Sequence, residues 1–237
     1  MNVALVPFYK SQLKNNIFKI NNSRDNVKFP YFNLKNKLLE HNIEINTVDL
    51  TSIKKADIIL FLSLDVRFLI KCFLNNKLKN SIYIQFEPPV VEPLNNSYNL
   101  KWISKIFQVI LTWQDDLLDN KKFFNFYFPL PPRISSQKKI DFSEKNFITT
   151  IVGRKKSKRK NQLYSERELA IEFFQEKSKD FLFFGYGWDK SLFSSYGGQV
   201  DSKLEKLKYF KYTICYENEE KINGLISGLC HKLTCGC

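Results

Sequence analysis

Apolar runs of strand length recur along the first half of the chain, with stretches of helical periodicity between them. Strands are predicted at residues 2–7, 43–48, 57–62, 81–86 and 106–111, and helices at residues 32–41 and 66–74. Residues 10–28 are polar and predict a loop that carries a short helix. Strands that alternate with helices are typical of parallel βαβ units, so the pattern predicts an α/β fold.

The second half repeats this order. Strands are predicted at residues 147–152, 181–185 and 212–216, and helices at residues 162–176 and 202–209. The apolar face of helix 162–176 is expected to consist of Leu163, Leu169, Ala170, Phe173 and Phe174. Prolines at 129, 131 and 132 stiffen the segment between the halves, as in a connection between domains. We expect two α/β domains, residues 1–132 and 147–237, joined by a linker at residues 133–146.

The net charge changes the picture because it is strongly positive. The 237 residues carry a formal charge of +13, which suggests an anionic partner: a nucleic acid, a nucleotide-diphosphate sugar or an acidic membrane face. The densest basic run is residues 154–160, and such runs are more often solvated loops than specific sites. The other charges are dispersed and no nucleic-acid-binding motif occurs. We therefore expect no nucleic-acid partner, although a basic nucleic-acid-binding module stays an alternative.

Targeting signals and metal-binding patterns add little. The N-terminus lacks the basic and apolar regions of a signal peptide, and no apolar run approaches the ~18–20 residues that cross a bilayer. Five cysteines, an odd number, fit reduced thiols. Cys230, His231, Cys235 and Cys237 crowd together without the paired spacing of zinc sites. We expect a cytoplasmic protein, with peripheral association with a membrane left open, and no bound metal.

Polar residues follow two of the predicted strands directly. Glu217 and Asn218 follow strand 212–216, and Glu87 follows strand 81–86, where Pro88 favours an extended backbone. The carboxyl ends of parallel strands are where open α/β sheets hold their ligands. A carboxylate and an amide at such an end suggest a polar ligand that carries hydroxyl groups. The alternative is an ordinary capping turn after a strand.

Several segments together are similar to one enzyme family. They are Phe86–Pro89, Thr112–Trp113, Ile151–Gly153, Asn161–Arg167, Phe184–Trp188, Gly198–Lys208 and Phe210–Asn218. In their order and spacing they resemble the motifs of the glycosyltransferase family 10 fucosyltransferases. Each segment alone is weak, whereas the series is fairly specific.

The resemblance implies a GT-B architecture, in which two Rossmann-like domains face a cleft. The first domain would bind an acceptor glycan and the second GDP-fucose. The implied reaction is an inverting transfer of fucose to a sugar hydroxyl, of the α1,3/1,4 type, without a bound metal or other cofactor. Such enzymes serve glycosylation of proteins or of lipopolysaccharide.

The resemblance also implies roles for particular residues. Glu87 would be the catalytic base, with Asp115 and Asp116 as the spare carboxylates. Arg154, Arg159 or Lys160 would neutralise the diphosphate, beside Asn161 and Tyr164 at the start of a helix. Glu217 and Asn218 would contact the hydroxyls of the donor sugar or of its ribose.

The chain departs from the family pattern after Gly224. Leu225, Gly228 and Leu229 stand where the family has an aromatic residue, a glutamate and a lysine. Family members also continue beyond the position of Cys237, so the resemblance implies an incomplete second domain. A non-catalytic nucleotide-sugar-binding remnant of the same fold is therefore the alternative to an active transferase.

Overall fold

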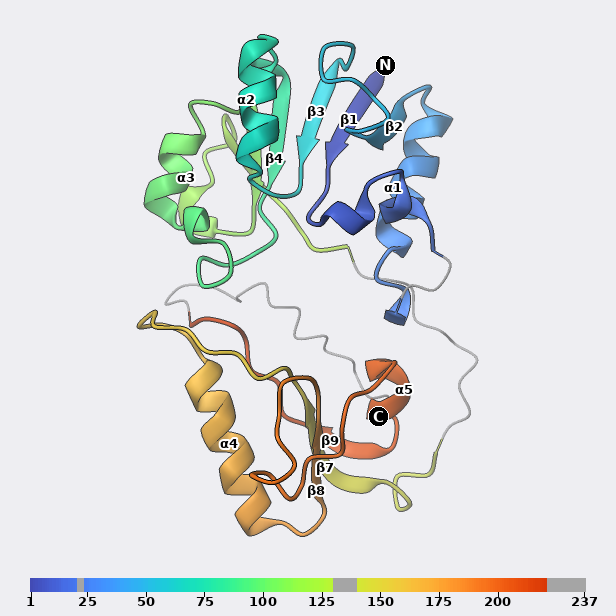
Figure 1. Ribbon diagram of the computed structural model, residues 1–237, viewed down its shortest axis with the longest axis vertical. Coiled ribbons are helices and arrows are strands. Elements are labelled where there is room, and N and C mark those ends of the chain that lie inside the picture. The colour runs from blue at the N-terminus through green and yellow to red at the C-terminus, as the bar shows by residue number, and fades with distance from the viewer. Residues whose placement is uncertain (21–23, 130–139, 221–237) are drawn as a thin grey trace. The chain divides into compact units, whose positions relative to one another are not determined.

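The protein, described here by a computed structural model, forms two compact units, Met1–Pro131 and Pro132–Cys237 (Figure 1). The structure describes residues 1–20, 24–129 and 140–220. Each unit has a parallel sheet and hydrophobic clusters of its own. The expected α/β class is confirmed, and both sheets are compatible with Rossmann-like folds.

The sheet of the first unit has six strands in the order β2-β1-β3-β4-β5-β6, and every pair is parallel. The strands are β1 (Asn2–Val6), β2 (Glu44–Thr47), β3 (Ile58–Phe61), β4 (Ser81–Ile84), β5 (Val109–Thr112) and β6 (Phe123–Asn125). Alternate residues of β1 point to opposite faces, so Val3 and Leu5 join one buried cluster while Ala4 and Val6 join the other. A sheet buried on both faces explains why its strands are short, almost continuously apolar runs.

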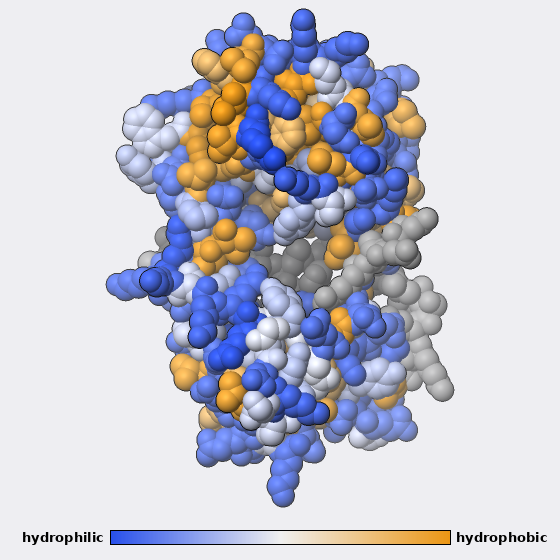
Figure 2. Space-filling view, viewed as in Figure 1, coloured by the Kyte–Doolittle hydropathy of each residue, from blue (hydrophilic) through white to orange (hydrophobic). Residues whose placement is uncertain are grey.

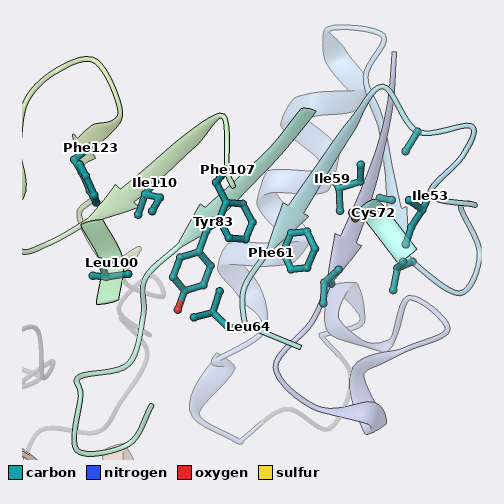
Figure 3. Close-up of a cluster of buried hydrophobic side chains, with 14 of the residues drawn as sticks. Ile53, Ile59, Phe61, Leu64, Cys72, Tyr83, Leu100, Phe107, Ile110 and Phe123 are labelled. Carbon is teal, nitrogen blue, oxygen red and sulfur yellow. The ribbon is translucent and has the colours of Figure 1, made fainter. Parts of the chain in front are cut away.

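Three helices of this unit cover the two faces of the sheet. They are α1 (Phe29–Glu40), α2 (Val66–Leu74) and α3 (Ser97–Ile103). Both α2 and α3 pack on the cluster that contains Phe61, Tyr83 and Phe107 (Figure 3). Tyr31 and Leu38 of α1 pack on the other cluster. Thus α2 and α3 share one face of the sheet and α1 covers the opposite face.

Short 3-10 helices connect the regular elements. They are η1 (Lys10–Gln12), η2 (Asn16–Phe18), η3 (Arg24–Asn26), η4 (Leu78–Asn80), η5 (Pro93–Asn95) and η6 (Asp115–Leu117). The first three lie in the segment for which a loop with one short helix was predicted. Residues 97–103, for which no helix was predicted, form α3, and the strand predicted at 106–111 begins only at Val109.

The described residues of the second unit, 140–220, form a three-stranded parallel sheet in the order β8-β7-β9. Its elements are β7 (Asn146–Ile151), α4 (Tyr164–Lys177), β8 (Phe181–Phe184), α5 (Lys203–Leu207) and β9 (Phe210–Thr213). Ile148, Ile171, Phe181 and Phe183 lie in one of its buried clusters. Residues 133–139 of the expected linker lie outside the described residues.

Two predictions for this unit are wrong in detail. The buried residues of α4 are Tyr164, Arg167 and Ile171, whereas Leu169 and Phe173 are exposed. Apolar residues lie all around this helix, so their spacing did not identify the inward face. The predicted strand 212–216 instead spans Phe210–Thr213, and Cys215 is exposed. Within the described sheet β9 is an edge strand, which is why half of the Tyr212 side chain reaches solvent.

No helix in the described parts of the chain is both long enough and apolar enough to cross a bilayer.

Candidate functional site

In the first unit, Glu87 lies just beyond the carboxyl end of β4 and is half-buried. The backbone that carries it is fixed from η5, because the Asn95 Nδ2 donates a 2.7 Å hydrogen bond to the carbonyl oxygen of Glu87. Gln85, two residues earlier, extends the sheet by donating its amide N–H to Leu111 O at 2.8 Å. The predicted base therefore stands at a strand end whose main chain is held in place.

A buried network of neutral side chains lies directly behind this strand end. Gln85 Oε1 accepts from Thr112 Oγ1 at 2.5 Å and from Gln114 Nε2 at 3.0 Å, while Gln85 Nε2 donates to Asn95 O at 3.2 Å. Gln114 Nε2 also donates to Asn95 O at 2.9 Å, and Tyr83 Oη donates to Asn95 Oδ1 at 2.7 Å. All of these residues are almost completely buried. The network joins the ends of β4 and β5 to η5. It thereby connects Phe86–Pro89 and Thr112–Trp113, two of the segments that resemble family motifs.

Aromatic rings pack around Phe86, the residue before Glu87, on the face of the sheet opposite Tyr83. Phe86 packs against Phe8, Tyr31, Phe126 and Phe128, with ring centroids 5.0–6.5 Å apart. Burial raises the pKa of the Tyr31 hydroxyl, and the negative charge of Glu87 raises it further. Glu87 therefore lies within electrostatic reach of a protonated phenol on α1.

The two spare carboxylates follow the next strand. Asp115 and Asp116 begin η6, and both are exposed. Asp116 Oδ2 accepts a 3.2 Å hydrogen bond from Ser97 Oγ at the start of α3. Ser97 Oγ also donates to Gln114 Oε1 at 2.9 Å, which ties this turn to the buried network.

In the second unit, the turn after β8 lies against the segment that leaves β7. Trp188 Nε1 donates to Val152 O at 2.7 Å, and Arg154 N donates to Tyr186 O at 2.9 Å. Gly185 has φ +141°, and a Cβ there would lie 1.9 Å from Val152 O. Only glycine combines this backbone angle with so close an approach. The contact brings together two of the segments on which the family resemblance rests.

Two predicted donor-binding segments also lie side by side within this unit. Leu163 N donates to Asn218 O at 3.1 Å, and Glu220 N donates to Asn161 O at 2.7 Å. The chain after β9 therefore runs along the segment that enters α4. Glu217 and Asn218 are half-buried, and Asn161 is exposed.

Arg167 joins these segments from α4. Its Nη2 donates to Tyr216 O at 3.1 Å and to Glu217 O at 3.2 Å, and its Nη1 reaches Gly153 O at 3.5 Å. The side chain is 6% exposed and its guanidinium lies 5.3 Å from the centre of the Tyr164 ring. Burial lowers the pKa of Arg167, yet an arginine stays charged at such a site. A buried positive charge thus holds the carboxyl ends of two strands by their carbonyl groups.

The three candidate cations differ in their surroundings. Arg154 Nη2 forms a 2.5 Å salt bridge with Glu168 of α4, and its guanidinium lies 5.6 Å from the Trp188 ring centre. Arg159 is half-buried and Lys160 is exposed at the entry to α4. Because Glu168 already engages Arg154, Arg159 and Lys160 are the better candidates for an external anion.

The beginning of α4 is partly occupied by its own chain. Gln162 Oε1 accepts from Tyr164 N at 2.6 Å and from Ser165 N at 3.1 Å. These are amides that a helix otherwise leaves open at its N-terminus. Tyr164 is buried. We therefore expect the contacts with an anion to come from the side chains that precede the helix.

Other predictions fall outside the described residues. They concern Gly224, Leu225, Gly228, Leu229, Cys230, His231, Cys235 and Cys237. Among the residues that are described, no group of three or more His, Cys, Asp and Glu side chains is arranged to hold a metal ion.

Four residues of the two strand-end regions were not predicted from the sequence. Gln85, Asn95 and Gln114 are buried side-chain amides, and Arg167 is a buried charge. A signal existed for Gln85, which interrupts the apolar run Ile82–Phe86. Arg167 ends the segment Asn161–Arg167 of the family resemblance, but nothing indicated its burial, because an arginine in a charged helix normally faces solvent.

Comparison of the sequence with models of known protein families gives no match, and comparison with curated protein sequences gives none either.

Proposed function

We propose that this protein is an inverting glycosyltransferase that moves fucose from GDP-fucose to a hydroxyl group of an acceptor glycan. The observation that carries the proposal is the pairing of residues 161–163 with residues 218–220 in the second unit. It gathers cations, an amide and a carboxylate at the carboxyl ends of parallel strands, where such sheets bind ligands. The resemblance of these same segments to fucosyltransferase motifs supplies the identity of the donor.

In the proposed reaction, the acceptor oxygen attacks the anomeric carbon of fucose as the bond from that carbon to the diphosphate oxygen breaks. Glu87 takes the proton of the attacking hydroxyl, a contribution of about 10²–10⁴ in rate. GDP leaves with the bonding electrons, and Arg159 and Lys160 stabilise the charge that develops on its diphosphate. The first unit would hold the acceptor and the second the donor, in a GT-B arrangement.

Glu217 and Asn218 would bind hydroxyls of the fucose or of the ribose. The carbonyl groups of Tyr216 and Glu217 are engaged by Arg167. We therefore expect the contacts of this segment with the donor to come from side chains rather than from these two carbonyl groups.

A second candidate is a protein that binds the nucleotide sugar without transferring it. It is favoured by Leu225, Gly228 and Leu229, because leucine and glycine cannot replace a carboxylate and a lysine at a fucosyl diphosphate. The loss of one charge-assisted contact costs about 1.5–3 kcal/mol. Binding would then be weakened and transfer abolished, while the fold persists.

Calorimetric titration with GDP-fucose tests the proposal, with GDP-mannose as the control ligand. We expect GDP-fucose to bind more tightly, and Lys160→Gln to weaken binding about 10- to 100-fold. The matched control is Lys156→Gln, an exposed lysine of the same loop, which should bind normally. Failure of GDP-fucose to bind at millimolar concentration would exclude both candidates.

Transfer to a panel of galactose- and N-acetylglucosamine-containing acceptors separates the two candidates. For the enzyme, Glu87→Gln should abolish transfer and leave GDP-fucose binding intact, whereas Asp115→Asn should leave both unchanged. Binding without transfer by the unaltered protein would favour the second candidate.

A further inference from the structure

The outward face of α2 is apolar. Phe68, Leu69 and Cys72 face the core, whereas Val66, Ile70, Phe73 and Leu74 are 60%, 53%, 67% and 74% exposed. Positions separated by four, seven and eight residues lie on one side of a helix. Helix α2 therefore has a second apolar stripe that no described part of the chain covers.

Basic residues accompany this stripe in the sequence. Residues 66–80 include four basic residues (Arg67, Lys71, Lys77 and Lys79) and no acidic one. Lys71 also lines a shallow hollow of about 200 Å³ together with Lys54 and Asn75. Asp65 forms an ion pair with Arg67, whereas the ion pairs found among the described residues do not involve Lys71 or Lys54. The hollow is thus a cationic recess beside an apolar stripe.

Exposed aromatic side chains also lie on α3, which covers the same face of the sheet. Tyr98 and Trp102 are 70% and 55% exposed, and the Lys105 ammonium lies 3.8 Å from the centre of the Trp102 ring. Tyrosine, tryptophan and lysine are the residues that gather where a protein meets the headgroup layer of a bilayer. Figure 2 shows hydrophobic side chains gathered over α2, at the upper left of the view, with strongly hydrophilic ones among them.

We infer that the exposed surface of α2 and α3 (Val66, Ile70, Phe73, Leu74, Tyr98 and Trp102) docks onto an anionic membrane surface. Helix α2 has nine residues and would lie in the plane of the interface, its apolar stripe among the acyl chains and Lys71 at the lipid phosphates. A second copy of this surface is a poorer partner, because self-pairing would bring its lysines together. This inference goes beyond the proposed function and does not depend on it.

Vesicle co-sedimentation of the full chain tests the inference. Two preparations are needed: phosphatidylcholine alone, and phosphatidylcholine with phosphatidylserine in equal parts. We expect binding to the anionic vesicles, which salt weakens. The double variant Phe73→Ser, Leu74→Ser leaves the charge unchanged and should lower partitioning at least about tenfold, because both side chains lose apolar area that the bilayer buries. Lys71→Gln should lower it about fivefold on anionic vesicles only.

Leu39→Ser is the matched control, since Leu39 is 62% exposed on α1, over the opposite face of the sheet. It should bind as the unaltered protein does. Replacing Lys155, Lys156 and Lys158 by glutamine tests the basic loop of the second unit. Loss of vesicle binding by this triple variant, while the double serine variant keeps it, would overturn the inference. So would the absence of vesicle binding, or a dimer in sedimentation equilibrium that the double serine variant dissociates.

Discussion

The two units hold their strand ends in different ways. In the first unit, neutral side chains at the ends of β4 and β5 and in η5 share a network of hydrogen bonds. In the second, one charged side chain of α4 reaches the carbonyl groups beyond two strands. A network of amides distributes its bonds over several residues, whereas in the second unit several segments depend on Arg167. We therefore expect a single substitution to destabilise the second unit more than the first.

The electrostatic cost also differs between the two arrangements. Burying an amide costs little free energy when each of its donors and acceptors has a hydrogen-bond partner. A buried guanidinium must recover a much larger loss of hydration, and carbonyl dipoles recover less of it than a carboxylate does. Tyr164 adds an aromatic face at 5.3 Å, which further favours the cation. Burying Arg167 thus costs considerable free energy of hydration, and its contacts connect the end of β7, α4 and the chain after β9.

The largest effect is expected from Arg167→Leu. The change removes the Arg167 donor from the carbonyl groups of Tyr216 and Glu217, at up to about 1–3 kcal/mol for each of these part-buried acceptors. We expect the free energy of unfolding to fall by about 2–5 kcal/mol in chemical denaturation. Hydrogen exchange should accelerate at the amides of Leu163 and Glu220, which bond to the released segment.

Arg154→Leu is the control for this change within the same unit. Its partner Glu168 is 23% exposed, so solvent can hydrate the carboxylate that is left, and the loss should stay near or below about 1 kcal/mol. An equal loss for the two arginines, or unchanged exchange at Leu163 and Glu220 in Arg167→Leu, would contradict the role assigned to Arg167.

Gln85→Leu should have an intermediate effect. Thr112 and Gln114 lose their shared acceptor, but each keeps another described contact: the Thr112 hydroxyl still accepts from Gln114 N, and Gln114 Nε2 still donates to Asn95 O. We expect a loss of about 1–3 kcal/mol. A double-mutant cycle with Thr112→Val should give a coupling energy of about 0.5–2 kcal/mol, because each change removes the bond at 2.5 Å. Strict additivity would show that the network contributes no cooperativity.

Much of the fold could be predicted from the sequence, because strands buried on both faces leave continuous apolar runs. The predictions for α2 and for β3, β4, β7 and β8 agree with the structure within two residues at either end. For α4 the periodicity failed, since its inward face includes an arginine while Leu169 and Phe173 point to solvent. Helix α3 was missed because its sequence, SYNLKWI, is only seven residues long, too short for a helical periodicity to stand out.

For the candidate site, the sequence identified strand ends but not what holds them. Glu87, Glu217 and Asn218 follow strands, so their place needed only the order of elements. Asn95 and Gln114 lie in turns and become buried only when η5 folds over the ends of β4 and β5. That contact joins residues 19 positions apart, which no local pattern records.

The smallest effect expected at neutral pH is that of Tyr83→Phe, which removes the bond to Asn95 Oδ1 at about 0.5–1.5 kcal/mol. The effect of Tyr83→Phe on the pH dependence of stability is the sharper test of the buried network of neutral side chains. Burial raises the pKa of Tyr83 above its ordinary value, although the bond to Asn95 lowers it. Above pH ~10 the unfolded chain loses this proton while the folded chain retains it, so stability falls as pH rises. Tyr83→Phe should reduce that alkaline slope by about 1.4 kcal/mol per pH unit, whereas Tyr127→Phe, at a side chain 82% exposed, is the control. Equal alkaline slopes for the two variants would mean that Tyr83 reaches water, and that the end of β4 is not sealed by Asn95.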